Sequence, residues 1–168
     1  MVDLFALAAF AGLLIYAACT DVASLTIPNW ISIAMAALFA PAALATGMPL
    51  SEIGMHFLFG LGMLAVGFFL FQANIIGGGD AKLLAAASVW TGFPAFMPFM
   101  FWTALAGGVL AVLLLAARRV FKQAEANPPF VNRLLKHQGG VPYGVAIMTG
   151  GLMALPALPF VLDPLTLP

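Results

Sequence analysis

The stretch that decides the fold is Asn74-Ile75-Ile76-Gly77-Gly78-Gly79-Asp80-Ala81-Lys82-Leu83, which interrupts an otherwise apolar chain. Three consecutive glycines are unfavourable in a regular element, because glycine loses the most backbone freedom on ordering. An acid and a base, Asp80 and Lys82, follow, and no other Asp, Glu, Lys or Arg lies between Glu52 and Arg118. Ionisable groups within hydrophobic segments are expensive and mark functional sites. We therefore expect the rest of the chain to position Asp80.

A structural interpretation of the same stretch is available. Asp is a favourable N-cap, and a helix is expected from Leu83, so Asp80 could cap that helix. The glycines could let two helices pack closely. A cap needs only one residue, however, and leaves the three glycines unexplained. The stretch also lacks the G-x-x-x-x-G-K-[ST] spacing of a phosphate-binding loop. We favour a functional role for Asp80.

The composition indicates an integral membrane protein. The 168 residues are 64% hydrophobic and only 7% charged, whereas about a quarter of a soluble domain is charged. The length allows about six spans of roughly 20 residues, so we predict one all-α, polytopic membrane domain over residues 1–168. The net charge of zero and the absence of a basic face argue against a nucleic-acid partner. The single cysteine, Cys19, allows neither an internal disulfide nor a cysteine-cluster zinc site. We predict no metal and no cofactor.

Turn residues divide the apolar sequence into six expected spans. Pro28 disfavours helix at the residue before it, and Asn29 is expected to cap the next helix. Gly47-Met48-Pro49, with Glu52, predicts a tight turn. A short fourth helix behind the glycines suggests that this backbone lines a cavity, and Thr91-Gly92-Phe93-Pro94 separates it from the fifth. The expected helices cover residues 4–20, 30–46, 53–71, 83–90, 98–117 and 141–162.

The distribution of Lys and Arg predicts the topology. Cytoplasmic loops gather these residues, and all 6 fall in two connections, at Lys82 and in the hydrophilic segment 118–140. Both connections follow odd-numbered helices, so we predict that they are cytoplasmic and that both termini are extracytoplasmic. Part of segment 118–140 is expected to lie on the membrane surface, as an amphipathic helix does.

The same parity brings two carboxylates to the cytoplasmic side. Asp21 follows the first expected helix and Asp80 the third, although Asp21 could simply end its helix at the interface. Two carboxylates about 3 Å apart share a proton. One can then take a proton from water while the other polarises a carbonyl and protonates the leaving amine. This is aspartic peptidase chemistry, and the glycines would let a substrate backbone approach Asp80. His56 and His137 fall on opposite sides and are expected to be a helix-end residue and a loop residue.

Three sequence motifs together resemble those of the type IV prepilin leader peptidases, which are membrane aspartic peptidases of bacteria. The resemblance spans essentially the whole chain. It implies that Asp21 and Asp80 are the catalytic pair. The motifs are G-x-G-D-x-K over residues 77–82, Asp21 followed by Ile27-Pro28-Asn29, and Val141-Pro142-Tyr143-Gly144 opening the last helix. On this basis the residues expected to bind substrate or shape the site are Gly77, Gly78, Gly79, Lys82, Pro28, Asn29 and Tyr143.

The resemblance also implies a substrate. Family members remove a short basic leader from prepilins or pseudopilins at the cytoplasmic face of the inner membrane. The small size resembles the peptidases of tight-adherence (Flp) pilus systems. Larger members carry a cysteine-rich zinc segment and also N-methylate the product, and one cysteine cannot build that segment, so we expect no methylation here. Many relatives have basic residues between the first Asp and I-P-N, but residues 22–26 here are uncharged.

Two alternatives use the same residues. G-x-G-D also occurs in presenilin-type proteases, but the nine transmembrane segments of that family do not fit this length. A small transporter or channel subunit could use Asp80 and Lys82 as an ion or proton site. Inverted halves would support a transporter, and the sequence shows none.

Overall fold

The chain is all-helical in a computed structural model, which describes residues 2–121, 123–136 and 139–159. No strand occurs in these ranges, so the predicted all-α class is confirmed. The helices are α1 (Val2–Ser24), α2 (Asn29–Ala45), α3 (Leu50–Gln72), α4 (Gly78–Val120), α5 (Pro129–Leu134) and α6 (Tyr143–Ala154), followed by the 3-10 turn η1 (Leu155–Ala157).

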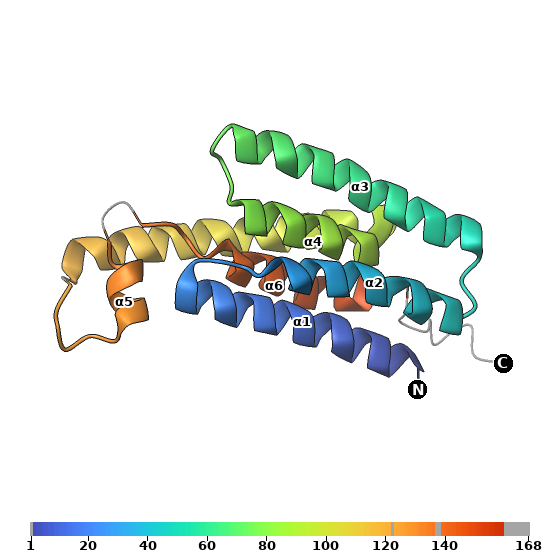
Figure 1. Cartoon of the computed structure of the whole chain (residues 1–168), viewed down its shortest axis with the longest axis horizontal. Helices are drawn as coiled ribbons and strands as arrows, with labels where there is room; N and C mark the ends of the chain where they lie inside the picture. Colours follow the sequence, from blue (N-terminus) through green and yellow to red (C-terminus); the bar gives the residue numbers. More distant parts are fainter. Residues whose placement is uncertain (1, 122, 137–138, 160–168) are drawn as a thin grey trace.

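Three helices are long and apolar enough to cross a membrane, namely α1 from Leu4 onward, α3 and α4. Two shorter apolar helices, α2 and the α6–η1 unit, accompany them. The arrangement is that of a polytopic membrane protein. In Figure 1 the N-terminus and the α2–α3 connection lie at one end of the molecule, and α5 lies at the other.

Helix α4 contains the reversal that the sequence predicted between residues 91 and 94. Gly92 has φ 53° and ψ −168°, a left-handed backbone that residues with a Cβ rarely adopt. Pro94 follows, where a helix start tolerates proline because its missing N–H is not needed. The 43-residue element is therefore two segments, and the second runs back toward α5 (Figure 1). Both are longer than predicted, because the first begins at Gly78 and the second continues to Val120.

Two expectations near residues 21–29 are corrected. Helix α1 does not end before Asp21 but continues to Ser24, so Asp21 lies in its last turn. Asn29 does not cap α2; Pro28 occupies the N-cap position, and the Asn29 side chain accepts a hydrogen bond from Lys82 instead. The chain turns between α1 and α2 through Leu25, which adopts φ 54°.

Two further boundaries differ from prediction. Helix α3 begins at Leu50, so Glu52 lies in its first turn rather than in the preceding connection. Helix α6 ends at Ala154 and tightens into η1, which contains Pro156; proline cannot continue a helix without losing a backbone hydrogen bond. The expected continuation of this helix beyond residue 159 lies outside the described residues.

The buried centre joins α1, α2 and the first segment of α4. Trp90 is fully buried and donates its indole N–H to the backbone oxygen of Met35 at 2.8 Å. The ring of Phe10 stacks on Trp90 at 5.1 Å, and the ring of Phe39 meets it edge-on at 5.8 Å. Helix α6 packs against α1 and α4, whereas α3 packs mainly against α4.

His56 is not a simple helix-end residue. Its Nδ1 lies 2.7 Å from the backbone oxygen of Val89, and its ring stacks on Phe39 at 4.9 Å. The last carbonyls of a helix lack intrahelical partners, and Val89 lies just before the break at Gly92. His56 therefore completes the hydrogen bonding of the first α4 segment, at the end away from Asp80. His137 lies outside the described residues.

Segment 118–140, which contains α5, folds against the last turn of α1. Arg118 donates to the backbone oxygens of Leu134 at 2.8 Å and Gly140 at 2.9 Å. Arg133 donates to the backbone oxygen of Ala23, in the last turn of α1. Beyond the end of α4 at Val120, the described part of this segment contains one regular helix, the six-residue α5. Its arginines thus act as donors that close the loop onto the bundle.

Candidate active site

A pocket of about 250 Å³ holds both predicted aspartates. It lies where α1 ends and α4 begins, and the α1–α2 connection forms one wall. The lining residues are Asp21, Leu25, Thr26, Ile27, Asn29, Gly77, Gly78, Gly79 and Asp80. The two carboxylates interact electrostatically. Residues almost 60 positions apart in sequence therefore share one polar site in an apolar protein.

Asp21 is held by the start of α6. The side chain is 4% exposed, and its Oδ2 accepts a hydrogen bond of 2.7 Å from the backbone N–H of Gly144. Gly144 is the second residue of α6, after Pro142 at the N-cap. The first N–H groups of a helix have no intrahelical partner, and the positive end of the helix dipole favours a carboxylate. Helix α6 thus orients Asp21.

Asp80 is the third residue after Gly77, the N-cap of α4. The Gly77 amide interacts with the Asp80 carboxylate, as an acidic residue at this position does in a capping box. Asp80 therefore has a role at the helix start, although it is not itself the N-cap. Its Oδ1 is buried and has no hydrogen-bond partner among the described residues. A buried, unpaired carboxylate oxygen is unfavourable unless another group completes it, and here it lies at the pocket.

Gly77 and Gly79 leave space for their neighbours, and none of the three glycines has an unusual backbone angle. A Cβ on Gly77 would lie 2.7 Å from Asp80 Oδ2, and one on Gly79 would lie 3.2 Å from the Ile27 Cβ and 3.3 Å from its backbone N. A Cβ on Gly78 would meet the Phe71 ring at 3.4 Å. Positive φ values among the described glycines occur at positions 47 and 92 only. Gly79 therefore lets the start of α4 pack onto the I-P-N motif.

A second contact links the same two motifs. Lys82 Nζ donates to Asn29 Oδ1 at 2.9 Å, across the gap between α4 and α2. Among the predicted site-shaping residues, Asn29 and the three glycines line the pocket, and Lys82 reaches it through Asn29. Pro28 begins α2 without lining the pocket.

Tyr143 is also not a lining residue, because its ring packs toward Gly107 of α4. The residue of this segment that contacts Asp21 is its neighbour, Gly144, through the backbone N–H. The sequence motif around Val141-Pro142-Tyr143-Gly144 pointed to the right place but not to the backbone N–H that contacts Asp21. No group of three or more His, Cys, Asp or Glu side chains able to hold a metal ion occurs in the described part of the chain.

The fold and the pocket define a helical membrane protein in which two aspartates line one pocket. The model of the type IV leader peptidase family matches residues 8–112, which include both aspartates. The chain belongs to this family, and it is therefore a membrane peptidase. No curated protein and no solved structure matches it. The family match favours the peptidase over the transporter alternative.

Proposed function

We propose that this protein is an aspartic endopeptidase that removes the basic leader from type IV prepilins or pseudopilins of the Flp kind, without N-methylating the product. The observation that carries the proposal is the single pocket shared by Asp21 and Asp80. Membership of the type IV leader peptidase family supports a prepilin-type substrate in general. The small size and the single cysteine support the narrower assignment.

The pocket supplies the groups that metal-free amide hydrolysis requires. One ionised carboxylate accepts a proton from the attacking water, while the other, protonated, polarises the scissile carbonyl and later protonates the leaving amine. The Gly144 N–H fixes one oxygen of Asp21, and one oxygen of Asp80 has no hydrogen-bond partner among the described residues. Gly77 and Gly78 leave one wall without side chains, so an extended substrate backbone can approach the carboxylates.

We propose that the pocket faces the cytoplasm of a bacterium, at the inner membrane, with both termini on the other side. Arg118 and Arg133 belong to the segment that packs beside the end of α1. Basic residues favour the cytoplasmic side and interact with anionic lipid. The end of the molecule that carries α5 is thus the end expected to be cytoplasmic (Figure 1).

The direct test is to change each aspartate to asparagine and co-express the variant with pilin-like precursors from the same genome. Asp21→Asn and Asp80→Asn should each abolish the mobility shift of the precursor, because each removes either the base or the shared proton. The double variant should be no worse than either single one, since residues that act as a unit do not contribute additively. Glu52→Gln, an acidic residue far from the pocket, is the matched control and should process normally.

Intact-mass measurement of the processed pilin tests the rest of the proposal, because N-methylation adds a defined mass to the new N-terminus. An unmodified terminus is expected.

If either asparagine variant processed its precursor at the wild-type rate while folded, the catalytic pair would be wrongly assigned.

A further inference from the structure

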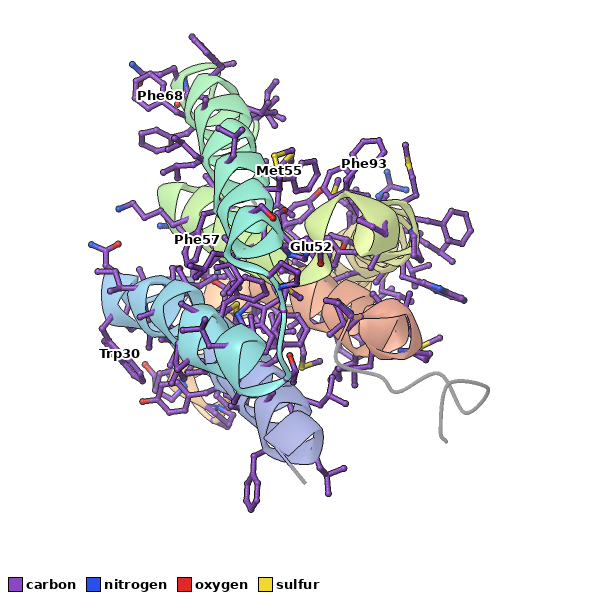
Figure 2. The ribbon with its side chains drawn as sticks, turned by 90° about the vertical axis from the view of Figure 1, so that its right-hand side faces the viewer. Trp30, Glu52, Met55, Phe57, Phe68 and Phe93 are labelled. Carbon is purple, nitrogen blue, oxygen red and sulfur yellow. The ribbon has the colours of Figure 1, made fainter. Side chains whose placement is uncertain are left out.

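A second, larger depression of about 450 Å³ lies between α2 and α3, above the first segment of α4. Both helices pack on α4 but have little contact with each other. Figure 2 shows α2 and α3 diverging, with Phe57 on the side of α3 toward α2, where its ring meets Phe39 edge-on at 5.7 Å. The lining residues of this groove are Asn29, Ser32, Ile33, Ala36, Phe57, Gly60, Leu61, Leu64, Lys82, Ala85, Ala86 and Val89.

The groove has exposed apolar walls and a buried floor. Ile33 on α2 is 67% exposed and Leu61 on α3 is 62% exposed, while Ala85 and Ala86 beneath them are buried. Gly60 is explained by helix packing alone, since a Cβ there would lie 2.3 Å from a Val89 methyl. The wall side chains of Ile33 and Leu61 differ from Gly60, because they remain mostly exposed and internal packing does not explain them. They form an open, apolar groove between the first half of α2 and the middle of α3.

The groove adjoins the pocket that holds the two aspartates. Asn29 lines both, and its side chain holds Lys82, which lines the groove. The Asn29–Lys82 pair thus forms a polar end of the largely apolar groove. Asn29 also lines the pocket that contains the two aspartates.

An unpaired hydroxyl indicates what kind of molecule the groove takes. Ser32 is 7% exposed, lines the groove, and its Oγ has no hydrogen-bond partner among the described residues. Helical serines usually bond the carbonyl four residues earlier, as Ser88 does with Leu84; for Ser32 that carbonyl belongs to Pro28, which accepts from the Ile31 N–H instead. An unpaired hydroxyl is unfavourable in an apolar medium. A polypeptide could pair with it, whereas a lipid acyl chain could not.

We propose that the α2–α3 groove docks the apolar helical segment of the substrate polypeptide, and that the adjoining extended residues pass over Asn29 into the Asp21–Asp80 pocket. This inference rests on the proposed function and names the surface that recognises its substrate. An apolar helix laid in an apolar groove is a recurrent mode of peptide recognition. Ser32 then meets a polar group of the docked segment.

The test compares two substrates on purified, detergent-solubilised full-length enzyme. One is a full-length pilin precursor, and the other is a short soluble peptide that spans the scissile bond but lacks the apolar segment. Ala36→Phe fills the groove, and Ala37→Phe, which adds the same ring on an exposed neighbouring position of α2, is the matched control. Ala36→Phe should lower kcat/KM for the precursor about tenfold or more, as loss of a modest binding contribution does. It should leave cleavage of the peptide within about twofold, and Ala37→Phe should alter neither.

Ser32→Ala supplies a second readout. If the hydroxyl pairs with substrate, KM for the precursor should rise about fivefold, the effect of losing one hydrogen bond, with kcat and peptide cleavage unchanged. The melting temperature should not fall, because the unoccupied protein loses only an unpaired polar group. A lower melting temperature with an unchanged KM would mean that Ser32 is structural.

Cross-linking locates the substrate segment directly. In a chain with Cys19→Ser, Leu61→Cys should form a disulfide with a cysteine placed in the apolar segment of an uncleavable precursor. Val66→Cys, exposed on another face of α3, should not. If Ala36→Phe cleaved the precursor like wild type and Leu61→Cys formed no cross-link, the groove would hold lipid only and the inference would be wrong. Continued cleavage by the wild type would still leave the proposed function standing, whereas failure of the wild type to cleave the full-length precursor would overturn that function instead.

Discussion

Gly144→Ala should lower the activity of this protein much more than its stability. A Cβ at position 144 would lie 3.0 Å from both the Cβ and Oδ2 of Asp21, whereas ordinary van der Waals contact begins near 3.4 Å. Asp21 must therefore move by several tenths of an ångström. Mispositioning a catalytic group by 1 Å can cost about 100-fold in rate, so we expect kcat/KM to fall roughly 10- to 100-fold. The backbone N–H that binds Asp21 remains.

The strain cannot easily be relieved by a shift of α6. Later in the same helix, a Cβ on Gly150 would lie 1.9 Å from Thr103 Oγ1 and one on Gly151 would lie 2.3 Å from a Leu14 methyl. Helix α6 is therefore already seated closely against α4 and α1. Replacing glycine by alanine also favours a helix by about 1 kcal/mol, so the folded state should not suffer greatly.

The assay measures precursor cleavage and the melting temperature of the purified variant side by side. Gly108→Ala is the matched control, because a Cβ there would contact nothing within 4 Å. It should gain the same helix preference and keep wild-type turnover. A folded Gly144→Ala protein with wild-type kcat/KM would refute the argument that α6 positions Asp21.

Three other predictions follow from the same structure. Gly79→Val should reduce cleavage at least about 100-fold while expression falls less, because the branched side chain would push the start of α4 away from Ile27; wild-type turnover would reduce the glycine to a packing residue. Arg118→Gln should make the 118–140 segment more sensitive to added protease and leave peptide cleavage nearly unchanged, since Arg118 donates to backbone oxygens within that segment, those of Leu134 and Gly140; loss of pilin binding alone would instead make the segment a docking element. Met48→Cys and Glu125→Cys, in a chain with Cys19→Ser, should react with an impermeant thiol reagent from opposite sides of the membrane, and reaction from one side would overturn the topology.

The sequence predicted the helical class and most breaks because those depend on local chemistry. Gly92 followed by Phe93 and Pro94 marks a reversal that only glycine accommodates without strain, and the structure has φ 53° at this position. The end of α1 was placed too early for the opposite reason. The turn there uses Leu25 at φ 54°, and a non-glycine residue in the left-handed region is uncommon. Asp21 had appeared to terminate the helix, whereas a partner from α6 satisfies it inside the last turn.

The candidate site could be predicted from sequence only where it uses ionisable side chains, which are rare in this apolar chain. Isolated acids in an apolar chain pointed to Asp80, and parity along the chain placed Asp21 on the same side. Gly144 could not be found in this way, since its contribution is a backbone N–H made available by the start of a helix. The reason for three glycines was also hidden. Their contacts with Ile27, Phe71 and the Asp80 carboxylate are long-range or depend on helix geometry.

The first segment of α4 is held by hydrogen bonds at both ends, and Asp80 lies at one of them. Asp80 lies about ten residues from Trp90, a rise of roughly 15 Å in an α-helix. At the Trp90 end, the indole N–H is anchored on Met35 and the carbonyl of Val89 on His56. At the Asp80 end, Lys82 is anchored on Asn29. Because α2 contributes Met35 at one end and Asn29 at the other, the two helices cannot slide along each other without breaking a hydrogen bond. The position of Asp80 is thus fixed at one end by Asn29, which lines the pocket, and at the other end by Met35 and His56, which do not.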